Sequence, residues 1–183
     1  TIPLGNTSDS AQFGLPDATI NPINDLCTND IPIQLTASNN GGNWSGVGVS
    51  PSGIFDPMES GPGTHTINYS IGNGICSSAI NSIEITVKPQ PVMPTIINNS
   101  VSYCQFEAAT SLSNTATGSD LLWYTSSTGG IGSAVAPTPD TSIGGTLSYW
   151  VTQNINGCES SRAEIQVLVQ SKPNIPNATS LVE

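Results

Sequence analysis

The sequence predicts an all-β protein made of two tandem immunoglobulin-like β-sandwich domains. Three observations support this fold class: apolar and polar side chains alternate with period two, one order of landmark residues occurs twice, and four cysteines are widely spaced. Short alternating stretches are typical of half-buried strands, and no stretch has helical spacing. Strands bounded by Gly, Pro and Asn at intervals of about ten residues favour a sandwich.

The predicted strands follow from the alternation. The residues predicted to share one face of a strand are Ile31, Ile33, Leu35 and Ala37; His65, Ile67, Tyr69 and Ile71; Leu147, Tyr149 and Val151; and Ala163, Ile165, Val167 and Val169. The dipeptides Asn73-Gly74 and Asn156-Gly157 tolerate positive φ, so each predicts a tight hairpin before the last strand of its half.

Two similar halves are indicated by a repeated order of residues. The landmarks are Cys27, Trp44, Tyr69 and Cys76 in the first half, and Cys104, Trp123, Tyr149 and Cys158 in the second. The Cys-to-Trp separations are 17 and 19 residues, and the Trp-to-Tyr separations are 25 and 26. The predicted organisation is a preceding repeat or linker over 1–17, a first domain over 18–88, a Pro-rich linker over 89–94, a second domain over 95–171, and a following linker or tail over 172–183.

The cysteines predict an oxidising compartment. None lies in a CxxC pair and the chain has one histidine, so the spacing does not favour a zinc site. Of three possible pairings, Cys27–Cys76 with Cys104–Cys158 places one disulfide inside each half, tying an edge strand to the final hairpin. Each would close a loop of roughly 50 residues and contribute about 4 kcal/mol to stability. The alternative is four free, buried thiols.

Charge excludes several partners. The chain has three Lys or Arg residues against 13 Asp or Glu residues, and its formal net charge is −10. Three cations cannot neutralise a row of phosphates, so nucleic-acid binding is not expected, and the same sign disfavours anionic membrane surfaces. No apolar run is long enough to span a bilayer, and no signal peptide is recognised.

Several motifs are shared with a known family. In the second half they are Tyr103-Cys104-Gln105, Leu122-Trp123-Tyr124, Ala136-Pro137-Thr138-Pro139, Tyr149-Trp150-Val151 and Asn156-Gly157-Cys158-Glu159-Ser160. In the first half they are Gly41-Gly42-Asn43-Trp44-Ser45-Gly46, Gly53-Ile54-Phe55, and the run from Gly61 to Tyr69. These segments resemble the bacterial Ig-like and PKD-like repeats of type IX-secreted surface adhesins of the Bacteroidota, including gliding-motility adhesins. The resemblance covers nearly all of residues 18–170 and brings no catalytic residues.

No catalytic, cofactor or metal site is predicted. His65 is the only side chain with an ordinary pKa near neutrality, and it lies in period with Ile67 and Tyr69, which indicates a structural histidine. The acidic residues are scattered through turns. The alternative is calcium at a junction loop, since Asp56 and Glu59 lie together and Asp25 and Asp30 flank Cys27, but no D-x-D-x-D-G pattern is present.

One surface is predicted to bind a partner. If Trp123 points inward, alternation directs Leu122, Tyr124, Trp150 and Leu168 outward on neighbouring strands. An exposed apolar and aromatic patch is typical of a partner surface, and aromatic faces also stack on sugars. The alternative is that a crossing loop over 134–139 covers it. Separately, Asp9-Ser10-Ala11 resembles the O-glycosylation motif of the same bacterial group, with Ser10 as the acceptor.

The predicted function is a non-catalytic, semi-rigid stalk segment of a large extracellular surface protein that presents adhesive regions. Its expected partners are neighbouring repeats of the same polypeptide, surface glycans and other cell-surface proteins. Two alternatives remain: a carbohydrate-binding or spacer module of a secreted glycoside hydrolase, and a fibre subunit that uses a terminal strand to complete a neighbour's sheet.

Overall fold

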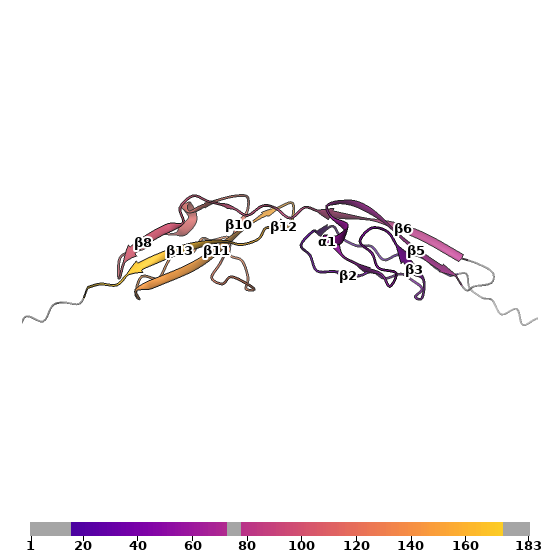
Figure 1. Cartoon of the computed structure of the whole chain (residues 1–183), viewed down its shortest axis with the longest axis horizontal. Helices are drawn as coiled ribbons and strands as arrows, with labels where there is room; N and C mark the ends of the chain where they lie inside the picture. Colours follow the sequence, from indigo (N-terminus) through magenta and orange to yellow (C-terminus); the bar gives the residue numbers. More distant parts are fainter. Residues whose placement is uncertain (1–15, 73–77, 174–183) are drawn as a thin grey trace, which may run out of the picture. The chain divides into compact units, whose positions relative to one another are not determined.

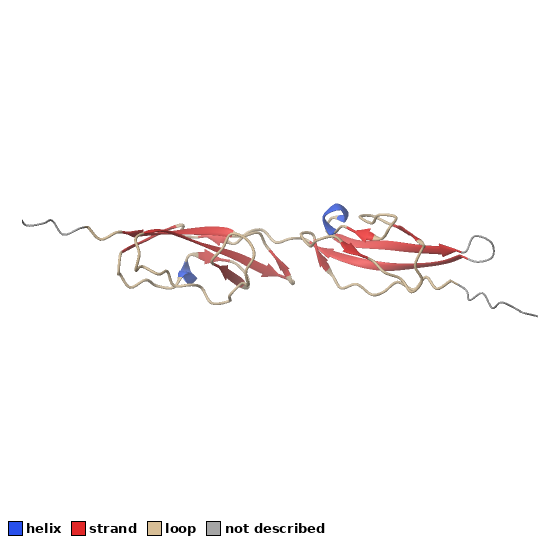
Figure 2. Cartoon of the chain, turned by 90° about the horizontal axis from the view of Figure 1, so that it is seen from below, coloured by secondary structure: helices blue, strands red, loops and turns tan. Residues whose placement is uncertain are grey.

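The chain folds into two compact units. The computed structural model describes residues 16–72 and 78–173. By their internal contacts these residues divide into a first unit within Thr1–Pro89 and a second within Gln90–Glu183. Strands and loops make up nearly all of both units (Figures 1 and 2), as the alternation predicts. In the described part of the chain, no helix has the length and apolarity that a transmembrane span requires.

The first unit is built on a four-stranded sheet in the order β1-β6-β5-β3. The bounds are β1 Leu26–Cys27, β3 Asn43–Ser45, β5 Gly63–Gly72 and β6 Ser78–Lys88. The β5 and β6 strands pair antiparallel over ten residues, whereas β1 runs parallel to the end of β6. A two-stranded sheet of β2 (Ile33–Gln34) and β4 (Ile54–Phe55) and the short helix α1 (Pro57–Ser60) complete the unit.

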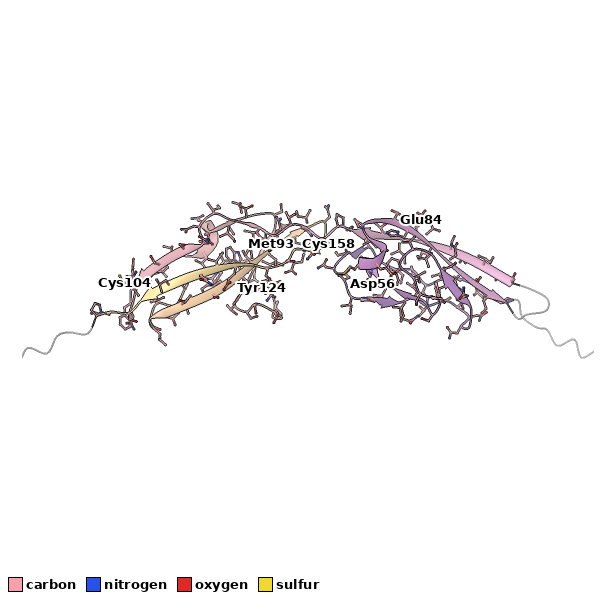
Figure 3. All side chains as sticks on the ribbon, viewed as in Figure 1. Asp56, Glu84, Met93, Cys104, Tyr124 and Cys158 are labelled. Carbon is pink, nitrogen blue, oxygen red and sulfur yellow. The ribbon has the colours of Figure 1, made fainter. Side chains whose placement is uncertain are left out.

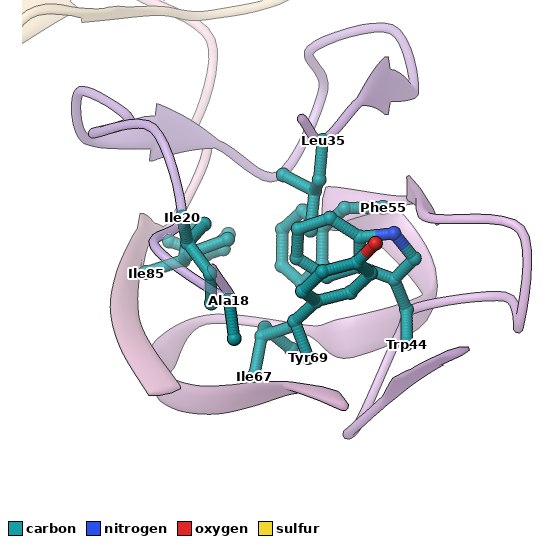
Figure 4. Packing of buried hydrophobic residues seen from close by; sticks show 9 residues of the cluster. Ala18, Ile20, Leu35, Trp44, Phe55, Ile67, Tyr69 and Ile85 are labelled. Carbon is teal, nitrogen blue, oxygen red and sulfur yellow. The ribbon is translucent and has the colours of Figure 1, made fainter. Parts of the chain in front are cut away.

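The core of the first unit forms around the predicted tryptophan and tyrosine (Figure 4). The rings of Trp44 and Tyr69 lie 4.5 Å apart with an angle of 39° between their planes. The Tyr69 hydroxyl donates to the carbonyl of Asn39 at 2.6 Å and accepts from the Gly42 N–H at 2.8 Å, so its polar end is satisfied. The buried cluster comprises Ala18, Ile20, Leu35, Trp44, Phe55, Ile67, Tyr69, Ile85 and Val87.

One predicted strand face is wrong at its start. Leu35 is buried, but Ile31 is 81 % exposed and lies outside the short strand β2. Pro32 follows Ile31 and cannot donate a ladder hydrogen bond, so the strand begins only after it.

The second unit has a sheet in the order β10-β11-β13-β8. The bounds are β8 Ser100–Cys104, β10 Leu121–Tyr124, β11 Gly145–Ile155, β12 Cys158–Glu159 and β13 Ala163–Gln170. The β8 strand runs parallel to β13, and the other ladders are antiparallel. A second small sheet pairs β7 (Thr95–Ile96) with β9 (Ala116–Thr117), beside the 3-10 turn η1 (Leu112–Asn114).

Alternation along β13 is complete. Every second residue from Ala163 to Val169 is buried, and the residues between them are exposed. The predicted inward positions Tyr149 and Val151 on β11 are also buried. The core comprises Leu112, Ala116, Trp123, Tyr149, Val151, Ala163, Ile165 and Val167.

The predicted hairpin at Asn156-Gly157 is confirmed. Both residues have positive φ, 56° and 86°, between the antiparallel strands β11 and β12. The matching dipeptide Asn73-Gly74 lies outside the described residues.

The predicted disulfide between Cys104 and Cys158 is wrong. Cys104 pairs with Gln170 at the end of β13, whereas Cys158 lies in the hairpin that precedes Ala163, the start of β13. The length of that strand separates them by about 23 Å, whereas a disulfide needs Cα atoms within about 7 Å. Figure 3 shows the two cysteines at opposite ends of the unit.

The states of the three described cysteines differ from one another. Cys27 and Cys158 are each disulfide-bonded, and Cys104 is a free, exposed thiol. The predicted partner of Cys27, Cys76, lies outside the described residues.

Candidate partner surface on the second unit

The outer face of the second unit's large sheet contains the residues predicted to bind a partner. Cross-strand register places them in rows. One row runs Tyr124, Trp150 and Glu164 across β10, β11 and β13. The row of Thr146, Leu168 and Ser102 lies four residues further along β13. At about 3.3 Å per residue, the two rows are about 13 Å apart.

Polar side chains separate the two apolar positions. Between the rows lies the row of Ser148, Gln166 and Ser100. Trp150 is half-buried, and Leu168 is 45 % exposed. The predicted single apolar patch is therefore two separate apolar points on a face of hydroxyl and amide groups.

A shallow cavity lies beside Leu168. Its volume is about 320 Å³. The lining residues are Asn99, Ser100, Val101, Ser102, Thr146, Gln166 and Leu168. The lining has three hydroxyl groups and two amides around two apolar side chains. This arrangement of donors and acceptors is suited to a polyhydroxylated ligand.

Tyr124 does not belong to this exposed face. The side chain is 7 % exposed, and a Cβ placed at Gly132 would lie 2.6 Å from its hydroxyl oxygen. The loop after β10 therefore covers the ring, and Leu122 lies under the same glycine with only partial exposure. The covering segment is this hairpin loop and not residues 134–139.

A buried polar cluster holds Tyr124 in place. Its hydroxyl donates to Oε1 of Glu159 at 2.5 Å, and the Thr152 hydroxyl donates to the same oxygen at 2.7 Å. The guanidinium carbon of Arg162 lies 3.6 Å from the centre of the Tyr124 ring. This position combines a cation–π contact with hydrogen bonds to a carboxylate.

Arg162 also fixes the covering loop. Its two terminal nitrogens donate to the carbonyl oxygens of Ser126 at 2.5 Å and Gly129 at 2.6 Å. One side chain thus joins the start of β13 to the loop that follows β10. No sequence pattern predicts this cluster, although Arg162 is one of only three basic residues.

The buried phenol of Tyr124 is expected to make the second unit less stable at alkaline pH. Burial raises the pKa of its phenol above the ordinary 10.0, and the hydrogen bond and negative charge of Glu159 act in the same direction. Because the pKa of this phenol is higher in the folded than in the unfolded chain, the protonated phenol stabilises the fold at any pH below its unfolded-state pKa. This contribution is lost as the pH rises through its folded-state pKa. We expect the free energy of unfolding to fall above about pH 10.

The measurement is urea unfolding of the second unit between pH 8 and 11. The Tyr124→Phe variant should lose less stability over this range than the wild type, because it lacks the phenol. Burial also raises the pKa of Tyr149, so part of the alkaline loss should remain in the variant. Identical slopes in both proteins would contradict the prediction.

The other residues singled out from the sequence have structural partners. His65 Nε2 lies 2.8 Å from the carbonyl oxygen of Gly61, and its ring faces Phe55. Asp56 caps α1 by accepting from the N–H groups of Met58 and Glu59. Among residues 16–72 and 78–173, no three His, Cys, Asp or Glu side chains are grouped to hold a metal. Ser10 lies outside the described residues.

The first unit presents a polar face at the matching positions. Thr66, Glu84 and Thr86 alternate with buried neighbours along β5 and β6. A half-buried tryptophan on the outer sheet face is thus a property of the second unit alone among the described strands.

Residues 91–171 match the family model described as "Ig-like domain CHU_C associated". The second unit is thus similar to this Ig-like family over nearly its whole described length. The resemblance identified from the motifs of this half is confirmed for the Ig-like unit.

No curated protein sequence matches the chain. Among solved structures, the insect immune protein hemolin, described in connection with homophilic adhesion, matches 90 % of the chain and 49 % of its own length, with 14 % identity and a TM-score of 0.37. Drosophila N-cadherin EC1-4 matches 87 % of the chain and 50 % of its own length, with 11 % identity and a TM-score of 0.29. Mouse cadherin-23 EC22-24 matches 81 % of the chain and 60 % of its own length, with 16 % identity and a TM-score of 0.26. The chain thus spans about half the length of the first two, and no function is transferred from likenesses this low.

Proposed function

We propose that the chain is a non-catalytic structural and adhesive segment of a large extracellular bacterial surface protein. The observation that carries the proposal is the match of residues 91–171 to an Ig-like family, a class whose members are generally non-enzymatic. Two tandem Ig-like domains, over 18–88 and 95–171, act as a semi-rigid stalk. Type IX secretion and gliding motility are the context that the motif resemblance implies.

The hydrogen bonds and prolines of the Pro-rich connector are an argument for a stiff stalk. Gln90 donates to the hydroxyl of Ser161 at 3.2 Å, and the Gln153 amide donates to the carbonyl of Val92 at 2.8 Å. Gln153 is buried and also accepts from the Ser119 N–H at 3.0 Å. The end of the connector is thereby held on the second unit, and its prolines restrict the backbone that remains.

The adhesive part of the proposal is the outer face of the second unit. Trp150 can stack on a sugar ring, and Glu164 and Gln166 on the next strand can bond its hydroxyl groups. The cavity beside Leu168 extends the polar part of this face. The partner class is a neutral glycan, because the unit carries too few cations to hold an acidic one.

A glycan array probed with the full chain and its Trp150→Ala variant tests this proposal. We expect the wild type to bind a subset of neutral glycans and the variant to lose at least about tenfold in affinity, because the stacking face is removed. Ile80→Ala, which removes an exposed apolar side chain of the first unit, is the matched control and should bind normally.

Two results separate the parts of the proposal. If the wild type binds no glycan and no cell surface, the adhesive role is wrong and a passive stalk remains. If a hydrolase domain is found to share the same polypeptide, the carbohydrate-binding or spacer alternative replaces the surface stalk.

A further inference from the structure

The β8 strand is an edge of the second unit's large sheet. It lies at one end of the order β10-β11-β13-β8 and, among the described strands, pairs with β13 alone. Its residues, Ser100–Cys104, include no proline and no charged side chain, which are common protections of an exposed edge. An edge of this kind offers unpaired N–H and C=O groups to another chain, so it needs protection from elsewhere.

Alternate backbone groups of β8 point away from the sheet. The Gln105 N–H, directly after the strand, donates to the Gln170 carbonyl at 2.8 Å and therefore faces β13. Backbone groups alternate in direction from one residue to the next along a strand. The N–H and C=O groups of Ser100, Ser102 and Cys104 therefore face outward.

Two side chains occupy the ends of this outward row. The Cys104 N–H donates to Oε2 of Glu107 at 2.7 Å, and the Glu107 N–H donates to the Cys104 carbonyl at 3.0 Å. At the other end, the Ser100 N–H donates to Oδ1 of Asn98 at 3.2 Å. These bonds leave both groups of Ser102 and the carbonyl of Ser100 facing outward. We refer to Asn98 and Glu107 as the edge caps.

The backbone holds both edge caps in position. The N–H groups of Ile97 and Asn98 donate to the Thr115 carbonyl at 2.8 and 3.3 Å. The hydroxyl of the buried Thr141 donates to the Glu107 carbonyl at 2.6 Å. Each cap therefore extends from a segment that the rest of the unit already fixes.

The opposite edge of the same sheet is covered differently. On β10, the Trp123 N–H donates to the Ser133 carbonyl at 2.8 Å, and the Ser133 N–H donates to the Trp123 carbonyl at 3.0 Å. Backbone covers this edge, so a side-chain substitution does not uncover it. On β8 the covering groups include two side chains, and substituting them exposes the edge.

The outward row of β8 is complementary to a second copy of itself. Two copies placed antiparallel about a two-fold axis at Ser102 bring Ser100 of each opposite Cys104 of the other. Opposed residues of this kind exchange both of their backbone hydrogen bonds. The side chains at these positions are small and uncharged, so no like charges oppose each other across the axis.

We propose that Asn98 and Glu107 keep the β8 edge closed to a second copy of this chain. With both caps in place only the central pair of Ser102 residues can form, because the Ser100 N–H and both groups of Cys104 are already bonded. Without the caps, pairing extends over the whole strand. The caps thus keep neighbouring copies apart, and this inference does not depend on the proposed glycan surface.

Sedimentation velocity of the full chain tests this proposal. Every protein carries Cys104→Ser, so that no disulfide forms between copies at that position. We expect the capped chain to be a monomer and the double variant Asn98→Ala, Glu107→Ala to dimerise, with an association constant at least about tenfold higher. Hydrogen exchange read by NMR should show the Ser102 amide becoming protected as the concentration of the double variant rises.

The matched control is the double variant Asn99→Ala, Glu164→Ala. It removes one exposed amide and one exposed carboxylate from the same sheet, and so changes the charge equally, but it leaves both edge caps in place. It should remain a monomer. The single variant Glu107→Gln keeps an oxygen acceptor and should also remain a monomer, whereas Glu107→Ala alone should dimerise more weakly than the double variant.

A further substitution checks the pairing register. Adding Ser102→Lys to the uncapped double variant places two ammonium groups opposite each other at the two-fold axis, so the dimer should dissociate. Four results would each overturn the proposal: a dimer of the capped chain, a folded double variant that stays monomeric, equal association of the control or of Glu107→Gln, or a dimer that persists after Ser102→Lys. If the double variant does not fold, Glu107→Ala alone is judged by the same criteria.

Discussion

Replacing Trp44 by alanine is expected to destabilise the first unit by about 3–5 kcal/mol. The indole is 6 % exposed and packs on Tyr69, and a Cβ at Gly53 would lie 2.6 Å from its Nε1. No neighbouring side chain can fill so closely bounded a space without moving the backbone, so most of the cavity would remain. The second unit has its own core and should keep its stability.

Hydrogen exchange read by mass spectrometry, in increasing urea and with the disulfide kept oxidised, separates the two units. Protection should be lost in β5 and β6 at lower urea than in the wild type, and should be unchanged in β11 and β13. The control Trp150→Ala removes a half-buried indole from an outer face and should cost far less. Simultaneous loss of protection in all four strands would show a single cooperative body.

Replacing Glu159 by alanine is expected to destabilise the second unit by about 2–4 kcal/mol. The carboxylate accepts from two buried hydroxyl groups, those of Tyr124 and Thr152, which are 7 % and 1 % exposed. Without it, both donors are left in an interior that holds little water, and the negative charge near Arg162 is removed. An unsatisfied buried donor costs more than the net worth of the bond it made.

Urea unfolding of the variant gives the free-energy change directly. Glu159→Gln keeps an oxygen acceptor and loses only the charge, so its loss should lie between those of the wild type and the alanine variant. Glu164→Ala, on the exposed face of β13, is the matched control and should change stability by less than about 0.5 kcal/mol. An alanine variant at position 159 as stable as that control would refute the role of the cluster.

Strand faces and turns could be predicted because they depend on local sequence. The alternation from Ala163 to Val169 and the Asn156-Gly157 dipeptide both carry their structural meaning within a few residues, and both predictions are confirmed. The family was also recognisable in the second half, because its motifs combine the buried Trp123 with the hairpin residues.

The cysteine pairing could not be predicted because it depends on strand register. Spacing alone places Cys104 and Cys158 in one unit, but only the parallel pairing of β8 with β13 shows that they lie at opposite ends of it. The prediction that Tyr124 is exposed was wrong for a similar reason. Alternation directs the ring outward correctly, but the glycine-rich loop that covers it has no hydrophobic pattern, and the arginine that holds the loop is distant in sequence.

The parallel pairing of β8 with β13 has a mechanical consequence. Because both strands run in one direction, the polypeptide enters the second sheet at one end and leaves it at the other. A pull on these two ends would load the backbone bonds from Ser100–Gln166 to Cys104–Gln170 in shear, so that they resist together and do not open one after another. A unit built this way should yield abruptly, at a high force, and would suit a tether that must bear tension.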